Sequence, residues 1–279
     1  MSDMQNFIAV PSAPQRFAPR VRQSFTTALA FIRDQRWASL IFLLVYLGLM
    51  YWDYLSVRLL PSPPPPEWTS NWPEALDPLK LQLGRQALGT WRSLLAGLVT
   101  LLYWGNALLY IADRADSFEK ESVVGLGRYL VRGFVIALLL ALPLAIGLVL
   151  LFIPGLLVAA ILIASATVAM FRENGIFKAI GEGYRLVTRS LPGQTRIFGF
   201  SRSFAHIVGA YGLVILGTIL FAGTAIFLAA GLAHWLPNLA LPLSYAQGVV
   251  SDLVGSFLNL SFSIFVLRLY AEYRTLVRS

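Results

Sequence analysis

Long apolar segments alternate with shorter polar ones along the chain, and this alternation is the first feature that constrains the fold. A helix that crosses the hydrocarbon core of a bilayer, about 30 Å thick, needs about 20 consecutive apolar residues. Six segments reach or approach that length, and they cover residues 37–60, 93–112, 134–152, 155–171, 207–230 and 246–267. The sequence therefore predicts an all-α polytopic membrane protein with six transmembrane helices.

The boundary between the third and fourth predicted helices is internal to one apolar run, residues 134–171. Ile153, Pro154 and Gly155 lie near its middle. Proline removes a helical hydrogen-bond donor, and glycine accepts the dihedral angles of a tight turn. We therefore expect the run to divide at this tripeptide, and we expect Pro143 only to kink the third helix.

Composition supports the membrane class. The 279 residues are 57% hydrophobic and only 13% charged, and the mean hydropathy is +0.68, whereas about a quarter of the residues in a soluble domain are charged. The chain has no cysteine, which excludes a disulfide framework and a thiolate metal site. Its two histidines, His206 and His234, fall at opposite ends of the fifth predicted helix, so they cannot share a site. We predict no cofactor, no metal site and no catalysis.

The basic residues are distributed unevenly between the two sides of the predicted bundle. Of the 22 Lys and Arg residues, only Arg58, Lys80, Arg85 and Arg92 lie on the opposite side, at the end of the first predicted helix or in the loop that follows it. All the others lie in the termini, in the loop between helices two and three, or in the loop between helices four and five. Because Lys and Arg are retained on the cytoplasmic side, both termini are predicted to be cytoplasmic. The net charge of +8 is then mostly topogenic, and nucleic acid is not expected as a partner.

A basic amphipathic segment precedes each predicted helix that leaves the cytoplasm. We predict that residues 1–36 form a cytoplasmic N-terminal segment and that residues 37–279 form the transmembrane domain. In the N-terminal segment, one helical face carries Phe25, Ala28, Leu29 and Ile32. Such segments can lie in the plane of the interface, with the apolar face toward acyl chains. The alternative is a set of ordinary juxtamembrane segments with a topogenic charge bias.

The other two segments precede the third and fifth predicted helices. Val123, Leu126, Leu130 and Val131 form the apolar stripe of one of them. In the other, Asn174 is the expected N-cap, the apolar stripe is Ile176, Ile180, Tyr184 and Val187, and the polar stripe is Lys178, Glu182, Arg185 and Arg189. We hypothesise that Arg128, Arg132, Arg185 and Arg189 contact anionic phospholipids.

Four polar residues inside the predicted helices could form an intramembrane polar path. They are Asp53, Asn106, Asp252 and Asn259. Ionisable groups within a bilayer are costly and often functional, whereas neutral polar side chains commonly form hydrogen bonds between helices. The first interpretation favours a transporter or a passive lipid translocase, and the second favours a packed helical bundle. Small residues in the predicted helices allow close helix contacts, and these could also join the protein to a second copy or to another membrane protein.

The stretch Ile153-Pro154-Gly155, the residues from Glu173 to Ile180, and those from Tyr184 to Val187 resemble a group of bacterial six-helix inner-membrane proteins. This group includes the proteins similar to YciC and the membrane domain attached to some glycerophosphodiester phosphodiesterases. The chain has Gly183 and Tyr184 where many of these proteins carry Ser-Trp. The resemblance implies a multi-pass protein of the bacterial cytoplasmic (inner) membrane, and it implies no catalytic residue. We therefore expect a non-catalytic accessory, scaffold or lipid-associated protein whose partners are membrane phospholipids.

Overall fold

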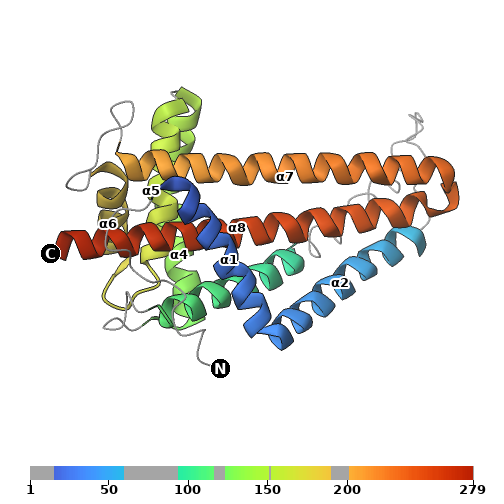
Figure 1. The fold of residues 1–279 in the computed structure, drawn as a ribbon, viewed down its shortest axis with the longest axis horizontal. Coiled ribbons are helices and arrows are strands. Elements are labelled where there is room, and N and C mark those ends of the chain that lie inside the picture. The colour runs from blue at the N-terminus through green and yellow to red at the C-terminus, as the bar shows by residue number, and fades with distance from the viewer. Residues whose placement is uncertain (1–15, 60–93, 116–122, 151, 190–200, 279) are drawn as a thin grey trace, which may run out of the picture. The chain divides into compact units, whose positions relative to one another are not determined.

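The computed structural model describes residues 16–59, 94–115, 123–150, 152–189 and 201–278, which are almost entirely helical (Figure 1). Within these ranges the β-type pairing consists of one bridge, between Val123 and Phe171. The all-α class is therefore confirmed. The helices are α1 (Phe17–Asp34), α2 (Arg36–Leu59), an unlabelled helix (Leu94–Asp113), α4 (Leu126–Leu150), α5 (Phe152–Val168), α6 (Ile176–Thr188), α7 (Arg202–Trp235), the 3₁₀ turn η2 (Pro237–Leu239) and α8 (Ala240–Arg278).

Four of these helices contain segments that are long and apolar enough to cross a membrane. The segments are Leu94–Asp113, Leu126–Gly147, Arg202–Trp235 and Pro242–Thr275. Two further apolar helices, Arg36–Trp52 and Ile153–Val168, are shorter. Each of the six overlaps one predicted transmembrane helix, and the four long ones are compatible with a multi-pass membrane protein.

The last two helices extend beyond the predicted spans at both ends. At 1.5 Å per residue, the 34 residues of α7 measure about 51 Å and the 39 residues of α8 about 58 Å. Both lengths exceed the roughly 30 Å of a hydrocarbon core. The predicted ends were placed where polarity rises, but a helix continues past that point unless a residue breaks it. Ser201 begins α7 as its N-cap, where its Oγ accepts a hydrogen bond from the Phe204 N–H at 3.1 Å.

The division between α4 and α5 differs from the prediction in two ways. First, α5 begins at Phe152, so Pro154 lies in its first turn, where the missing N–H costs no hydrogen bond. Second, Leu126 and the residues after it belong to α4 itself, so the amphipathic segment before the third predicted helix is not a separate interfacial helix. The two helices approach closely at Gly147, where a Cβ would lie 2.9 Å from the backbone of Gly155.

The chain divides into two compact units. The first comprises Met1–Gln35, Trp104–Phe221 and Leu253–Ser279, and the second comprises Arg36–Tyr103 and Ala222–Asp252. The core of the first unit contains fully buried residues from every part of it, including Phe31, Ile111, Ile136, Phe171, Leu186, Ile207 and Phe265. In the second unit, the rings of Phe42 and Tyr103 stack with their centroids 4.2 Å apart. The Tyr103 hydroxyl lies 2.5 Å from Ser39 Oγ.

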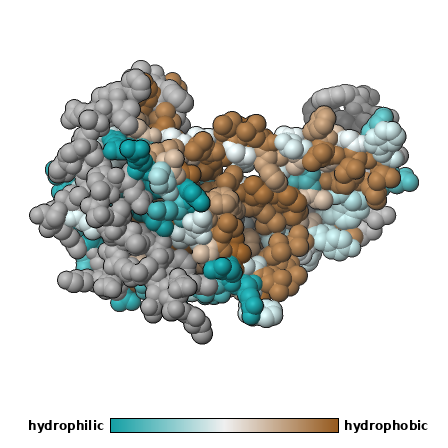
Figure 2. All heavy atoms as spheres, viewed as in Figure 1, coloured by the Kyte–Doolittle hydropathy of each residue, from teal (hydrophilic) through white to brown (hydrophobic). Residues whose placement is uncertain are grey.

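Large apolar side chains remain exposed along the long helices. The buried residues of α7 fall within its first third, at Ser203, Phe204, His206, Ile207 and Ala210. Beyond them, Ile219, Leu220 and Phe227 are 62%, 61% and 78% exposed. Hydrophobic residues gather along the face drawn in Figure 2. Water would oppose the exposure of so many aliphatic side chains, whereas hydrocarbon would not.

Candidate functional site

A buried polar cluster joins α1 to α7 and α8. Arg20, which is 2% exposed, forms an ion pair with Glu272 of α8, which is 4% exposed. Its second terminal nitrogen, Nη1, donates to Nδ1 of His206 on α7 at 2.7 Å. The guanidinium also lies 5.8 Å from the centroid of the Phe265 ring. Burial lowers the pKa of Arg20, and the charge of Glu272 opposes that effect.

A second set of hydrogen bonds continues this attachment along α1. Arg268 of α8 donates from Nη2 to Oγ1 of Thr27 at 2.8 Å and from Nη1 to Oε1 of Gln23 at 3.2 Å. The buried face of α1 is therefore largely polar, with Arg20, Ser24 and Thr27 beside Ala28 and Phe31. Helix α1 is present as predicted, and Ala28 of its predicted apolar face is buried. The predicted apolar residues Phe25 and Leu29 are 41% and 48% exposed.

Helix α6 packs on α5 through small residues. Its buried residues are Ala179, Gly183, Leu186 and Val187. The approach is closest at Gly183, where a Cβ would lie 2.7 Å from the backbone N of Ser165 and 2.9 Å from its Cα. The N-cap prediction was wrong: Gly175 is the N-cap, and Asn174 is buried, where its Nδ2 donates to the Val168 carbonyl and the Tyr270 hydroxyl at 3.4 Å each.

The remaining surface of α6 combines exposed aromatic side chains with a basic stripe. Phe177 and Tyr184, two turns apart on one face, are 80% and 55% exposed. Lys178, Arg185 and Arg189 follow the neighbouring face and are exposed as well. Arg185 also pairs with Glu182 at 2.9 Å. We call these two exposed faces, Phe177, Tyr184, Lys178, Arg185 and Arg189, the aromatic-basic surface of α6.

The four arginines predicted to contact lipid differ in their surroundings. Arg128, Arg185 and Arg189 are exposed. Arg132 is half-buried, and its Nη1 donates to the carbonyls of Ala169 and Phe171 at 3.0 Å each. These bonds satisfy backbone acceptors that follow the end of α5, so Arg132 has a structural role.

The two asparagines of the predicted polar path lie in the first unit. Asn106 and Asn259 are both exposed, and the hydrogen bonds between described side chains do not join them. Asp252 accepts a hydrogen bond from the buried Tyr46 hydroxyl at 3.0 Å, so α2 supplies the partner of this carboxylate. The side chain of Asp53 lies outside the described residues.

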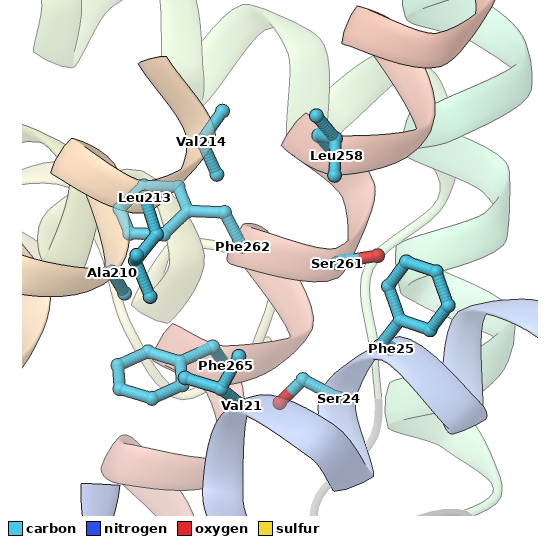
Figure 3. Close-up of a pocket in the computed structure, with 10 residues that line it drawn as sticks. All are labelled: Val21, Ser24, Phe25, Ala210, Leu213, Val214, Leu258, Ser261, Phe262 and Phe265. Atoms are coloured by element: carbon cyan, nitrogen blue, oxygen red, sulfur yellow. The ribbon is translucent and has the colours of Figure 1, made fainter. Parts of the chain in front are cut away.

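An apolar groove lies in the first unit, between α1, α7 and α8 (Figure 3). Its volume is about 90 Å³. Phe262, Phe265 and Ala210 are buried at its floor, and Phe25 and Leu213 are exposed at its rim. A second apolar cleft, in the other unit, is lined by residues of α2 and α8 that include Met50, Tyr54 and Tyr245. Neither cleft includes Asn106 or Asn259 in its lining.

Sequence reasoning missed Arg20, Glu272 and the exposure of Phe177. Arg20 was counted only among the topogenic charges, and its partner is 252 positions away, a separation that no local pattern bridges. The available signal was the lone acidic residue, Glu272, among the arginines that follow the last apolar run. Phe177 could have been recognised as the aromatic residue opposite the small residues Ala179 and Gly183.

Within the parts of the chain that the structure describes, no group of three or more His, Asp or Glu side chains could hold a metal ion. No protein-family model matches the chain, and no curated protein or solved structure is similar to it.

Proposed function

We propose that this chain is a non-catalytic, multi-pass protein of the bacterial inner membrane that contacts anionic phospholipids at the cytoplasmic surface and has an accessory or scaffold role. The observation that carries the proposal is the aromatic-basic surface of α6. A helix held to the protein by one face, with exposed aromatic and basic faces, has the pattern of an interfacial helix. The aromatic side chains suit the acyl-chain boundary and the basic ones suit phosphate.

The arrangement of α6 is more informative than its composition alone. Because Ala179, Gly183, Leu186 and Val187 already cover the protein-facing side, Phe177 and Tyr184 are left without a protein surface among the described residues. Lys178, Arg185 and Arg189 outnumber the single acidic residue, Glu182, on this surface. An anionic lipid surface satisfies both features at once, with about 1 kcal/mol of attraction for each basic residue near it.

The proposed topology has six transmembrane helices and both termini in the cytoplasm. Four helices have the length and hydropathy of spans, and the α7–α8 hairpin turns at Pro237–Leu239. The alternative of a transporter would require a polar path, and the described clefts are lined mostly by apolar residues. Neither of these two clefts supplies such a path.

Cysteine labelling tests the topology, and the absence of native cysteine makes single-site labelling straightforward. In intact cells, an impermeant maleimide is expected to label Asn238→Cys, in the exposed turn after α7. It is expected to label Lys178→Cys, on α6, only after permeabilisation. Labelling of Lys178→Cys in intact cells would show that α6 faces the exterior and would overturn the proposal.

Spin labelling tests the aromatic-basic surface in the full chain. Nitroxides at Phe177→Cys and Tyr184→Cys are expected to be several-fold more accessible to oxygen than to a water-soluble nickel chelate when the protein is in phosphatidylglycerol vesicles. The matched control is Lys178→Cys, on the basic stripe of the same helix, which is expected to show the opposite preference.

The contribution of charge is tested by adding Lys178→Gln, Arg185→Gln and Arg189→Gln to the Phe177→Cys protein. The label is then expected to become more accessible to the nickel chelate, because the electrostatic attraction to the anionic surface has been removed. Equal accessibility of the labels at positions 177 and 178 to the nickel chelate would contradict contact with lipid. It would indicate that α6 faces water.

A further inference from the structure

We infer that the groove between α1, α7 and α8 holds part of one acyl chain of a membrane phospholipid. This inference rests on the proposed function only in that it requires the chain to be embedded in a bilayer. It does not depend on the aromatic-basic surface of α6. The occupant follows from the polarity of the lining, from the surface onto which the groove opens and from the charge beside it.

The lining offers no polar site to a ligand. Its two serine hydroxyls donate to their own helices: Ser24 Oγ to the Arg20 carbonyl at 2.8 Å, and Ser261 Oγ to the Phe257 carbonyl at 3.0 Å. The other residues of the lining are aliphatic or aromatic (Figure 3). Apolar cavities of such size do not hold ordered water, because a buried water needs two to four polar partners. Hydrocarbon is the chemistry that this surface accepts.

The groove opens onto the lipid-exposed side of α7. Leu213 at its rim is 48% exposed, and Leu216 and Leu220, three and seven positions further on, are 52% and 61% exposed. Residues at these spacings lie on one helical face. An acyl chain next to α7 can therefore pass from this face onto Phe262 and Phe265 without crossing a polar barrier.

The charge beside the groove complements a phosphate. Arg22 lies three positions before Phe25 on α1, so the exposed guanidinium and the rim phenylalanine are neighbours on that helix. The buried Arg20 is already paired with Glu272 and does not need a lipid phosphate. A phospholipid with its phosphate at Arg22 and one chain over Phe25 into the groove satisfies both the charge and the apolar lining.

Photocrosslinking of the full chain tests this inference. The protein is reconstituted with a phosphatidylglycerol that carries a diazirine in one acyl chain, and the adducts are mapped by mass spectrometry. Adducts are expected on residues 210–214 and 258–265, at least several-fold above those on the exposed Leu216, Ile219 and Leu220. Val214→Trp, which places a larger side chain in the groove, is expected to lower them at least fivefold, and the control Leu216→Trp is expected to leave them unchanged.

An even distribution of adducts along α7, or the same adducts in Val214→Trp as in the unaltered chain, would overturn the inference. If Val214→Trp does not fold, Phe25→Ala replaces it: loss of the rim is expected to lower the groove adducts, and retention of all of them would contradict the assignment. The same experiment gives a different pattern of adducts if the proposed function, and not the groove assignment, is wrong. A chain that is not embedded yields no adducts on any helix, and an α6 that faces water leaves the groove adducts in place.

Discussion

Replacement of Arg20 by methionine is expected to lower the free energy of unfolding by about 3–5 kcal/mol, because it leaves the buried Glu272 carboxylate without its ion-pair partner. Methionine keeps much of the side-chain length, so the effect is mainly one of charge. Denaturant titration of the detergent-solubilised protein, followed by circular dichroism, measures it. Arg33→Met, on the exposed side of the same helix, is the matched control and is expected to change stability by less than about 0.5 kcal/mol.

The double variant Arg20→Met and Glu272→Leu separates charge from packing. Removal of both charges takes away the buried carboxylate as well, so most of the lost stability is expected to return. His206 would then lose the donor at its Nδ1, which limits the recovery. If Arg20→Met were no more destabilising than Arg33→Met, the ion pair would not attach α1 to α8, and the described packing of α1 would be wrong.

Replacement of Gly183 by alanine is expected to destabilise the protein by about 1–3 kcal/mol, the usual cost of overpacking a tight contact. The added Cβ would lie 2.7 Å from the Ser165 backbone N, and backbone cannot move aside as the end of a flexible side chain can. Either α6 must move away from α5 or both helices must shift. Thermal unfolding of the detergent-solubilised protein measures the loss.

Gly181 provides a control on the same helix. A Cβ at this position meets nothing within 4 Å, and the residue is exposed. Alanine has a higher helix propensity than glycine, so Gly181→Ala is expected to stabilise the protein by about 0.5–1 kcal/mol. The two substitutions are chemically identical and two residues apart, so their opposite signs would be due to packing. The same sign for both would mean that α6 does not contact α5 at Ser165.

The helical class and the approximate position of each apolar helix were predictable because both depend on local composition. A run of about 20 apolar residues specifies a span whatever its neighbours are. The amphipathic segment of α6 was predictable for the same reason, since its periodicity is contained in 13 residues. The ends of α7 and α8 were not, because hydropathy detects the edge of the apolar run and a helix continues past that edge.

The choice of buried face could not be predicted from the same patterns. On α1 the hydrophobic pattern identifies Phe25 and Leu29 as apolar but does not identify the side that packs on the protein. That side includes Arg20, whose burial depends on Glu272 at the other end of the chain. On α6 the apolar stripe does not identify the packing side, because Ala179 and Gly183, which lie outside the stripe, are buried together with Val187, which lies within it. Close helix contacts favour small residues, and hydropathy gives those residues little weight. The partner of Asp252, Tyr46, likewise depends on a pairing between distant helices.

The proposed topology places α5 across the bilayer, and its length would then affect the surrounding lipid. Its 17 residues measure about 26 Å, a few ångströms less than an average hydrocarbon core. The backbone of Gly155, near the start of α5, lies close to Gly147 of α4. A hairpin of this length would draw the two leaflets toward each other, and the lipids beside it would tilt or shorten to keep it covered.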